Sequence, residues 1–301
     1  MELNDVKNKI IFWYNKLQNH PMKFISSVFI VFFAITVLIS LLFPVLSKYI
    51  LPTFSIGIYN KAFWDGVLIN LNSSLIDFLF FGLLLFYFQD RNSRKQFKEQ
   101  MIDELGDISK YNESQVNLKK IGLFRRLNEL GIKSFSLQRM ELSGEGIEIR
   151  SLEFIDSDFI GARMEGIYMN DVLFKNTNLH AVSFDNTTMR NVVFENCKLS
   201  NVKMNHVKCK NVTFKGCDFT GGVLSNGQFK SCDFRGGRFD KVKFTGANLN
   251  RANMRDCLCI NAEDISQAKD INYLVADVSV INELKRINQD NIKYYQIRDT
   301  A

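Results

Sequence analysis

Residues 181–205 read AVSFD NTTMR NVVFE NCKLS NVKMN, and an apolar residue stands at the fourth place of every block of five. The same series runs from Ile149 to Cys259 without a miss. Of its 23 positions, 11 are Phe, 5 Met, 4 Leu, 2 Cys and one Ile. Neither an α-helix nor a flat β-strand has a period of five. The pattern therefore predicts a repeat architecture over residues 147–262.

The other places of each block carry their own preferences. Two residues before the apolar position, the side chain is mostly small or β-branched. Two residues after it, the 22 sites from Asp156 to Asn261 hold 8 Asn, 6 Gly and 3 Asp, the residues that tolerate positive φ. A corner at every block gives a four-sided coil, so four blocks make one coil. Roughly six coils, stacked at about 4.8 Å, would make a rod about 25–30 Å long.

This pattern resembles the pentapeptide-repeat family, whose consensus is approximately A(D/N)LXX. The best matches are AVSFD at 181–185, GANLN at 246–250 and RANMR at 251–255. The resemblance covers about 116 residues. It implies a mainly β repeat fold, a right-handed quadrilateral parallel β-helix.

The four-block coil also predicts which side chains stack. One inward column should run through the core and consist of Phe154, Phe174, Phe194, Phe214, Phe234 and Met254. Cys197 and Cys217 are likewise four blocks apart and should lie one above the other as reduced thiols. All six cysteines lie inside the repeat, where they are interpreted as small buried residues rather than as metal ligands or disulfides.

Two apolar segments precede the repeat and predict a transmembrane hairpin, residues 24–88. The spans are expected at about 24–46 and 67–88, each long enough to cross a hydrocarbon core of about 30 Å. Residues 5–20, within an N-terminal segment 1–23, suit either a helix in the membrane interface or a soluble helix. Lysine and arginine flank the hairpin at both outer ends, so the positive-inside rule predicts an integral plasma or inner membrane protein with both termini cytoplasmic.

The second span carries a polar stripe on one helical face, formed by Asn70, Ser73, Ser74 and Asp77. An ionised Asp near the bilayer centre costs about 2.5–3.5 kcal/mol, so the stripe should face protein, either the first span or a second copy of the chain. Hydrogen bonding between helices is the favoured interpretation, and an ion or proton pathway is the alternative.

Segments on either side of the repeat predict helical caps. Residues 89–146 are expected to be a helical connector with a break near residues 110–113 and a C-cap glycine at Gly131. Its excess of basic residues could bind anionic headgroups or be solvated. A helix at 115–130 should cover the start of the coils, and an amphipathic helix at 279–295, within a C-terminal cap 263–301, should cover their end.

The chain offers no catalytic motif. Its three histidines are far apart, and no phosphate loop, nucleophile elbow or zinc pattern occurs, so we expect neither an enzyme nor a cofactor nor a bound metal. The outward residues suggest one basic patch, with solvated surface as the alternative; it consists of Lys198, Lys203, Lys208, Lys210 and Lys215. Within 147–262, 16 Lys and Arg outnumber 12 Asp and Glu, which argues against imitation of DNA, and nucleic acid is not an expected partner.

The sequence thus favours a non-enzymatic, membrane-tethered scaffold. Its β-helical rod would bind an unknown cytoplasmic protein, and the hairpin in the lipid bilayer would support a homo-oligomer. The alternative is a membrane effector, a pore- or channel-like defence or toxin component, in which the rod senses a partner and the hairpin alters membrane permeability.

Overall fold

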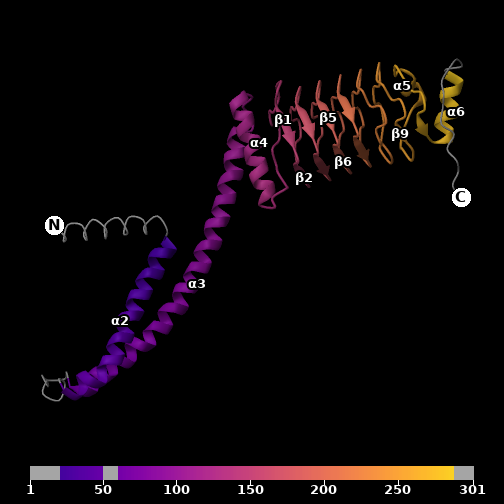
Figure 1. Ribbon diagram of the computed structural model, residues 1–301. Coiled ribbons are helices and arrows are strands. Elements are labelled where there is room, and N and C mark those ends of the chain that lie inside the picture. The colour runs from indigo at the N-terminus through magenta and orange to yellow at the C-terminus, as the bar shows by residue number, and fades with distance from the viewer. Residues whose placement is uncertain (1–20, 50–59, 288–301) are drawn as a thin grey trace. The chain divides into compact units, whose positions relative to one another are not determined.

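The structure is a computed structural model that describes residues 21–49 and 60–287 (Figure 1). The N-terminal helix predicted within 5–20 lies outside these residues, as do residues 288–295 of the predicted cap. Two compact units meet between Phe97 and Lys98, inside one long helix.

The first unit contains a helical hairpin. Helix α2 (Pro21–Tyr49) runs antiparallel to the first part of α3 (Lys61–Ile108). Phe29 stacks on Phe78 with ring centroids 5.7 Å apart, and the Asn72 side chain donates a hydrogen bond to Ser40 Oγ at 3.0 Å. Both helices are long and apolar enough to cross a membrane. Helix α3 continues without a break from the predicted second span into the predicted connector.

The second unit begins with the end of α3, which stops at Ile108, and with α4 (Ser114–Glu129). The helix break falls at the predicted place. Gly131 follows the end of α4 with φ +79°, and its N–H donates to the Asn128 carbonyl at 2.9 Å. A glycine reaches this conformation without strain, which explains its position here.

The repeat region is a parallel β-solenoid with four sides. Side 1 is the sheet β1 (Glu148–Arg150), β3 (Tyr168–Asn170), β5 (Thr188–Arg190) and β7 (Lys208–Lys210). Side 2 is the sheet β2 (Glu153–Ile155), β4 (Leu173–Lys175), β6 (Val193–Glu195) and β8 (Thr213–Lys215). Side 3 and side 4 are ladders of single bridges, which start at Ser136↔Asp158 and Glu141↔Arg163.

Every inner coil consists of four blocks of five, as the series predicts. Phe154 pairs with Phe174, Phe174 with Phe194, and Phe194 with Phe214. Their rings stack with centroids 4.9–5.0 Å apart, and Phe234 continues the column at 5.0 Å. Such stacked rings contribute beyond the apolar area that they bury.

The first and last coils are longer than the inner ones. Ser136 pairs with Asp158 and Asn248 with Asp270, so the chain takes extra residues to complete a coil at each end. The coils therefore extend beyond the five-residue series on both sides. At the far end β9 (Asn253–Met254) pairs with β10 (Val275–Ala276), across a loop that contains α5 (Ala262–Ser266).

A helix covers each end of the stack of coils (Figure 1). Phe124 of α4 meets Phe135 and Phe154 edge-on, with centroids 5.0 and 5.3 Å away. At the other end α6 (Val278–Ile287) buries Ile281 and Leu284 against the last coil. Both caps stand where the sequence predicts them.

The corners have the predicted backbone conformation. All 22 positions at five-residue steps from Ser151 to Asp256 have positive φ. The series ends at Asn261, which has φ −112° and instead caps α5 by accepting a hydrogen bond from the Glu263 N–H at 2.8 Å. The neighbouring Cys259 has φ +55° and an exposed side chain, so the expectation that every cysteine of the series is buried is wrong there.

We expect Gly216→Ala to destabilise the solenoid more than Gly166→Ala. Both glycines have φ of +65° to +66°, so both variants carry backbone strain of about 1 kcal/mol. A Cβ on Gly216 would also lie 2.5 Å from Asn196 Oδ1, whereas nothing lies within 4 Å at Gly166. The loss of unfolding free energy should be about 1–2 kcal/mol at Gly216, because the exposed Asn196 side chain has to shift, measured by denaturant unfolding of the full chain. Equal losses in the two variants, or no recovery on adding Asn196→Ala to Gly216→Ala, would contradict this.

Candidate functional site

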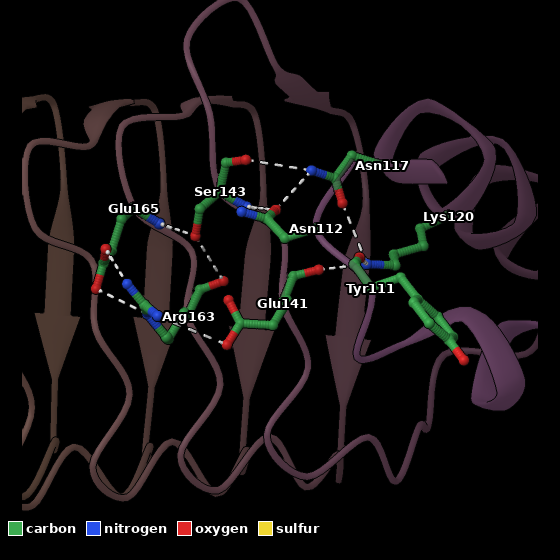
Figure 2. Close-up of polar contacts among 8 residues, drawn as sticks. All are labelled: Tyr111, Asn112, Asn117, Lys120, Glu141, Ser143, Arg163 and Glu165. Carbon is green, nitrogen blue, oxygen red and sulfur yellow. Dashed lines mark hydrogen bonds and ion pairs between the residues drawn. The ribbon is translucent and has the colours of Figure 1, made fainter. Parts of the chain in front are cut away.

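A dense polar cluster in the second unit lies where α4 meets the first coil (Figure 2). In an inner coil the backbone pairs with a neighbouring coil: the Arg163 N–H donates to the Met140 carbonyl, and the Arg163 carbonyl accepts from the Leu142 N–H, both at 2.8 Å. The first coil has no coil before it. Its backbone groups at Glu141 and Ser143 would be left as an open strand edge, which is unfavourable when buried and prone to pair with other chains when exposed.

The connection between α3 and α4 supplies the missing partners. The Glu141 N–H donates to the Ser109 carbonyl at 2.9 Å, and the Ser143 N–H donates to Asn112 Oδ1 at 3.0 Å. The Asn117 side-chain amide donates to the Ser143 carbonyl at 3.2 Å. Two asparagine side chains and one backbone carbonyl thus replace part of a preceding coil.

Lys120 completes the closure from the buried face of α4 (Figure 2). Its side chain is fully buried, and its ammonium donates to the carbonyls of Tyr111 and Glu141 and to Asn117 Oδ1. Three acceptors match the three protons of an ammonium group. Burial lowers the pKa of Lys120 from 10.5 to about 8, partly opposed by the Glu141 carboxylate.

Further contacts tie this cluster to the second coil. Ser143 Oγ accepts from the Glu165 N–H at 3.2 Å and donates to the Arg163 carbonyl at 3.3 Å. The Arg163 guanidinium pairs with Glu165 at 3.1 Å and with Glu141 at 3.8 Å. The hydrogen bond from Arg163 lowers the pKa of Glu165. The cluster is therefore a polar lock that fixes the end of the solenoid.

Sequence reasoning did not single out this lock, although a signal was present. Asn117 and Lys120 share the helical spacing of Phe124 and Leu127, so they stand on the apolar stripe of α4. Polar residues on a buried stripe need partners, and an open strand edge is where partners are needed. Within residues 21–49 and 60–287, no three His, Cys, Asp or Glu side chains gather as metal ligands would.

The five lysines predicted as a basic patch do not gather on one surface. Lys198 belongs to the bridge ladder of side 3 and Lys203 to that of side 4. Lys208 and Lys210 lie on side 1, and Lys215 lies on side 2. Because the chain turns a corner every five residues, lysines spaced by about five residues lie on successive sides. These five lysines therefore form a belt around a single coil.

The polar stripe of the second span does lie together, but it turns away from α2. Asn70, Ser73, Ser74 and Asp77 are all exposed along α3. The contact with α2 is made instead by their neighbour Asn72, through its hydrogen bond to Ser40, and by the buried Leu75. Of the two predicted protein neighbours, the first span therefore does not contact the stripe within one chain.

Comparison with known proteins agrees with the geometry of the coils. The family model described as a pentapeptide repeat region matches residues 187–263, and the model described as pentapeptide repeats in eight copies matches residues 153–191. The coils are pentapeptide repeats. The matches begin after the hairpin and the connector, so the family assignment concerns the solenoid.

Several solved structures of pentapeptide-repeat proteins are similar over about half of the chain. A trypsin-treated form of QnrB1, a plasmid-mediated fluoroquinolone resistance protein, is 15% identical over 53% of this chain and 89% of its own, with a TM-score of 0.34. Rfr23 from the cyanobacterium Cyanothece 51142 is 10% identical over 52% of this chain and 99% of its own, with a TM-score of 0.29. No curated protein matches this chain.

The pentapeptide geometry explains the buried cysteines. In several coils the residue before the side 3 position donates a side-chain hydrogen bond to a carbonyl of the preceding coil: Thr177 Oγ1 reaches the Phe154 carbonyl at 3.0 Å, and Cys197 Sγ reaches that of Phe174 at 3.3 Å. Cys217 and Cys257 occupy the same place in later coils. Burial raises the pKa of Cys257 to about 12, so this thiol stays protonated at neutral pH.

We expect Lys120→Met to loosen the end of the solenoid. It leaves the Tyr111 and Glu141 carbonyls without their donor, at a cost of about 2–4 kcal/mol in unfolding free energy. Hydrogen exchange of the full chain should speed up most at Leu142 and Ser143. The control is Lys119→Met on the exposed face, which breaks only the surface ion pair with Glu104 and should cost less than about 1 kcal/mol. Similar losses in both variants would refute the lock.

The lowered pKa of Lys120 predicts a pH dependence. Between pH 8 and about 10.5 the unfolded chain still binds the proton that the folded chain has released, so the unfolding free energy rises with pH. Below pH 8 the lysine is charged in both states and the penalty of burying it is constant. From pH 7.5 to 9.5 the native chain should gain about 2 kcal/mol relative to Lys120→Met, measured by denaturant unfolding. A difference that shrinks over this range would contradict the assignment.

Proposed function

We propose that the chain is a membrane-tethered scaffold whose pentapeptide-repeat rod binds a protein partner and whose hairpin anchors it in a bilayer. A pentapeptide-repeat solenoid is typically an interaction or scaffold module. The membrane anchor is inferred from one observation, the apolar outer surface of α2 and α3. Within the most apolar stretch of each helix, only 6% of the residues are buried, and Leu41 and Ile76 are 72% and 73% exposed.

A surface of this kind is unfavourable in water, because each fully exposed Leu or Ile forgoes about 1.5–3 kcal/mol of burial. Ser26–Val45 has 20 residues and a mean hydropathy of 2.9, which is the length and composition of a membrane span. The basic residues at both outer ends of the hairpin favour a topology with the rod in the cytoplasm. Six free cysteines suit that reducing compartment.

The polar stripe supports self-association in the bilayer. Asn70, Ser73, Ser74 and Asp77 face away from α2, so in lipid they would need polar partners from outside the chain. The same stripe of a second copy offers such partners, since amide and hydroxyl groups donate and accept between helices. The stripe also keeps the membrane effector open as the rival function, because a ring of Asp77 side chains could line an ion pathway.

One experiment separates the two functions. The full chain is expressed with Asn70→Leu and Asp77→Asn together, and both oligomer size and membrane conductance are measured. The scaffold predicts that the oligomer dissociates to smaller species while conductance equals that of cells without the protein. Asn72→Leu is the control, because Asn72 bonds within the hairpin and should leave oligomer size unchanged.

The opposite pattern would overturn the scaffold. If the native chain conducts ions, if Asp77→Asn abolishes that conductance and if the rod captures no partner, the effector function replaces it. If the double variant keeps the oligomer size of the native chain, the polar stripe is not part of the interface between copies.

A further inference from the structure

We propose that side 1 of the solenoid, from Thr188 to Arg251, binds the headgroups of an anionic phospholipid surface. This proposal concerns the rod and goes beyond the anchor, although it draws on the proposed presence of a bilayer nearby. The outward and corner positions of side 1 in these coils hold five cations and no carboxylate. The cations are Arg190, Lys208, Lys210, Lys230 and Arg251.

These side chains form a regular array. Arg190 pairs in register with Lys210, and the bridge Lys208↔Gln228 places Lys230 next in the same column. Successive coils lie about 4.8 Å apart, so the column carries three like charges within about 10 Å. All five cations are exposed. The remaining outward residues of this surface are hydrogen-bonding amides and hydroxyls, namely Thr188, Asn191, Asn211, Gln228, Ser231, Asn248 and Asn250.

Some outward cations on other sides of the rod have carboxylate partners. Lys175 pairs with Glu195 of the next coil on side 2 at 3.2 Å. Arg235 pairs with Asp233 at 2.7 Å. The fold therefore allows a carboxylate beside an outward cation, and the chain uses one at these places.

The acid-free stretch of side 1 has clear limits. Arg150 pairs with Glu148 at 2.6 Å, but it lies two coils before the stretch begins. Asp171 lies just before the stretch and Asp270 just after it, and each accepts a hydrogen bond from an asparagine within it. At the far limit, the Arg251 guanidinium lies over the Tyr273 ring, 5.4 Å from its centroid. The central column of cations is thus the part that carries the charge of this surface.

Stacked like charges oppose folding, because like charges directly opposite each other in a sheet are destabilising. Nothing about packing demands them here, since the outward positions of a pentapeptide repeat bear no core contacts. Elsewhere the chain places a carboxylate at such positions. An external anion is therefore the partner that this surface fits, and a row of phosphates is the anion that matches a row of cations and amide donors.

A lipid surface fits better than a nucleic acid. Side 1 is built from short strands in register, and a regular ladder of this kind suits a planar membrane whose headgroups move laterally to meet fixed cations. No aromatic side chain stands at its outward positions between Thr188 and Arg251, so bases would find no stacking platform there. Because the hairpin tethers the rod to a membrane, it also raises the effective concentration of that membrane's headgroups at side 1.

The test compares lysines on the same coils. The full chain is placed in nanodiscs of phosphatidylcholine alone, or of phosphatidylcholine mixed with phosphatidylglycerol, and the acetylation rate of each lysine is measured by mass spectrometry. We expect Lys208, Lys210 and Lys230 to react at least fivefold more slowly in the anionic discs at low salt, and to recover at high salt. The exposed lysines of sides 3 and 4, namely Lys198, Lys203 and Lys243, should change less than twofold.

Two other outcomes would overturn the proposal. One is equal protection of both lysine sets, or of neither. The other is stronger protection of the side 1 lysines by a short RNA added to neutral discs, which would make nucleic acid the ligand. A chain that does not stay in either disc would instead refute the proposed anchor, so the two failures are distinguishable.

Matched variants provide a second measurement. Lys208→Gln, Lys210→Gln and Lys230→Gln together remove three charges from side 1, and Lys198→Gln, Lys203→Gln and Lys243→Gln remove three from sides 3 and 4. Chains held in neutral discs are mixed with phosphatidylglycerol vesicles. The first variant should bind at least tenfold more weakly than the native chain and the second within twofold, both with an unchanged thermal midpoint. Equal weakening in both variants would show that binding depends on net charge and not on side 1, and it would overturn the proposal.

Discussion

A backbone corner with positive φ recurs every five residues from Ser151 to Asp256, and the rest of the solenoid depends on it. Four such corners bring the chain back above its starting point, so each coil stacks in register on the one before. The register places phenylalanine on phenylalanine and one backbone carbonyl above the next N–H. Asn, Asp and Gly fill most corners because they reach this conformation at low cost. Where Gly216 follows Asn196, the asparagine side chain occupies the space that a Cβ would need.

The ends of the solenoid are stabilised by different contacts from those of its middle. A periodic stack satisfies every inner coil with the same contacts, but the first coil lacks a predecessor and the last lacks a successor. At the start, the buried Lys120 and two asparagines supply the donors and acceptor that a coil would have given, and Phe124 packs edge-on against the buried ring of Phe154. At the finish, a longer coil and the apolar face of α6 close the core. The contacts at each end are made by particular residues that do not recur, whereas every inner coil uses the same repeated contacts.

This difference decides what could be predicted from the sequence. The sides, the corners, the phenylalanine column, the helix break and the caps all follow from spacing, because spacing fixes which residues share a side. The exposure of Cys259 does not follow, since the chain leaves the repeat at Asn261 to begin α5. The lock around Lys120 was missed because it joins residues that are far apart in the sequence and share no period. The belt of lysines was misjudged although the four-block coil already placed its members on different sides.

The outward positions are free of packing constraints, so their charges report on something other than stability. Residues 132–172 hold four Lys and Arg against eight Asp and Glu, and residues 173–257 hold fourteen against six. In the first group, cations are neutralised within the chain by pairs such as Arg163 with Glu165 and Lys133 with Glu153. In the second group, side 1 has cations stacked on cations with no carboxylate beside them. A fold that accepts any residue at these positions would not accumulate like charges in one column by its own energetics. The segregation therefore points outward, to an anionic surface that approaches the rod from one side.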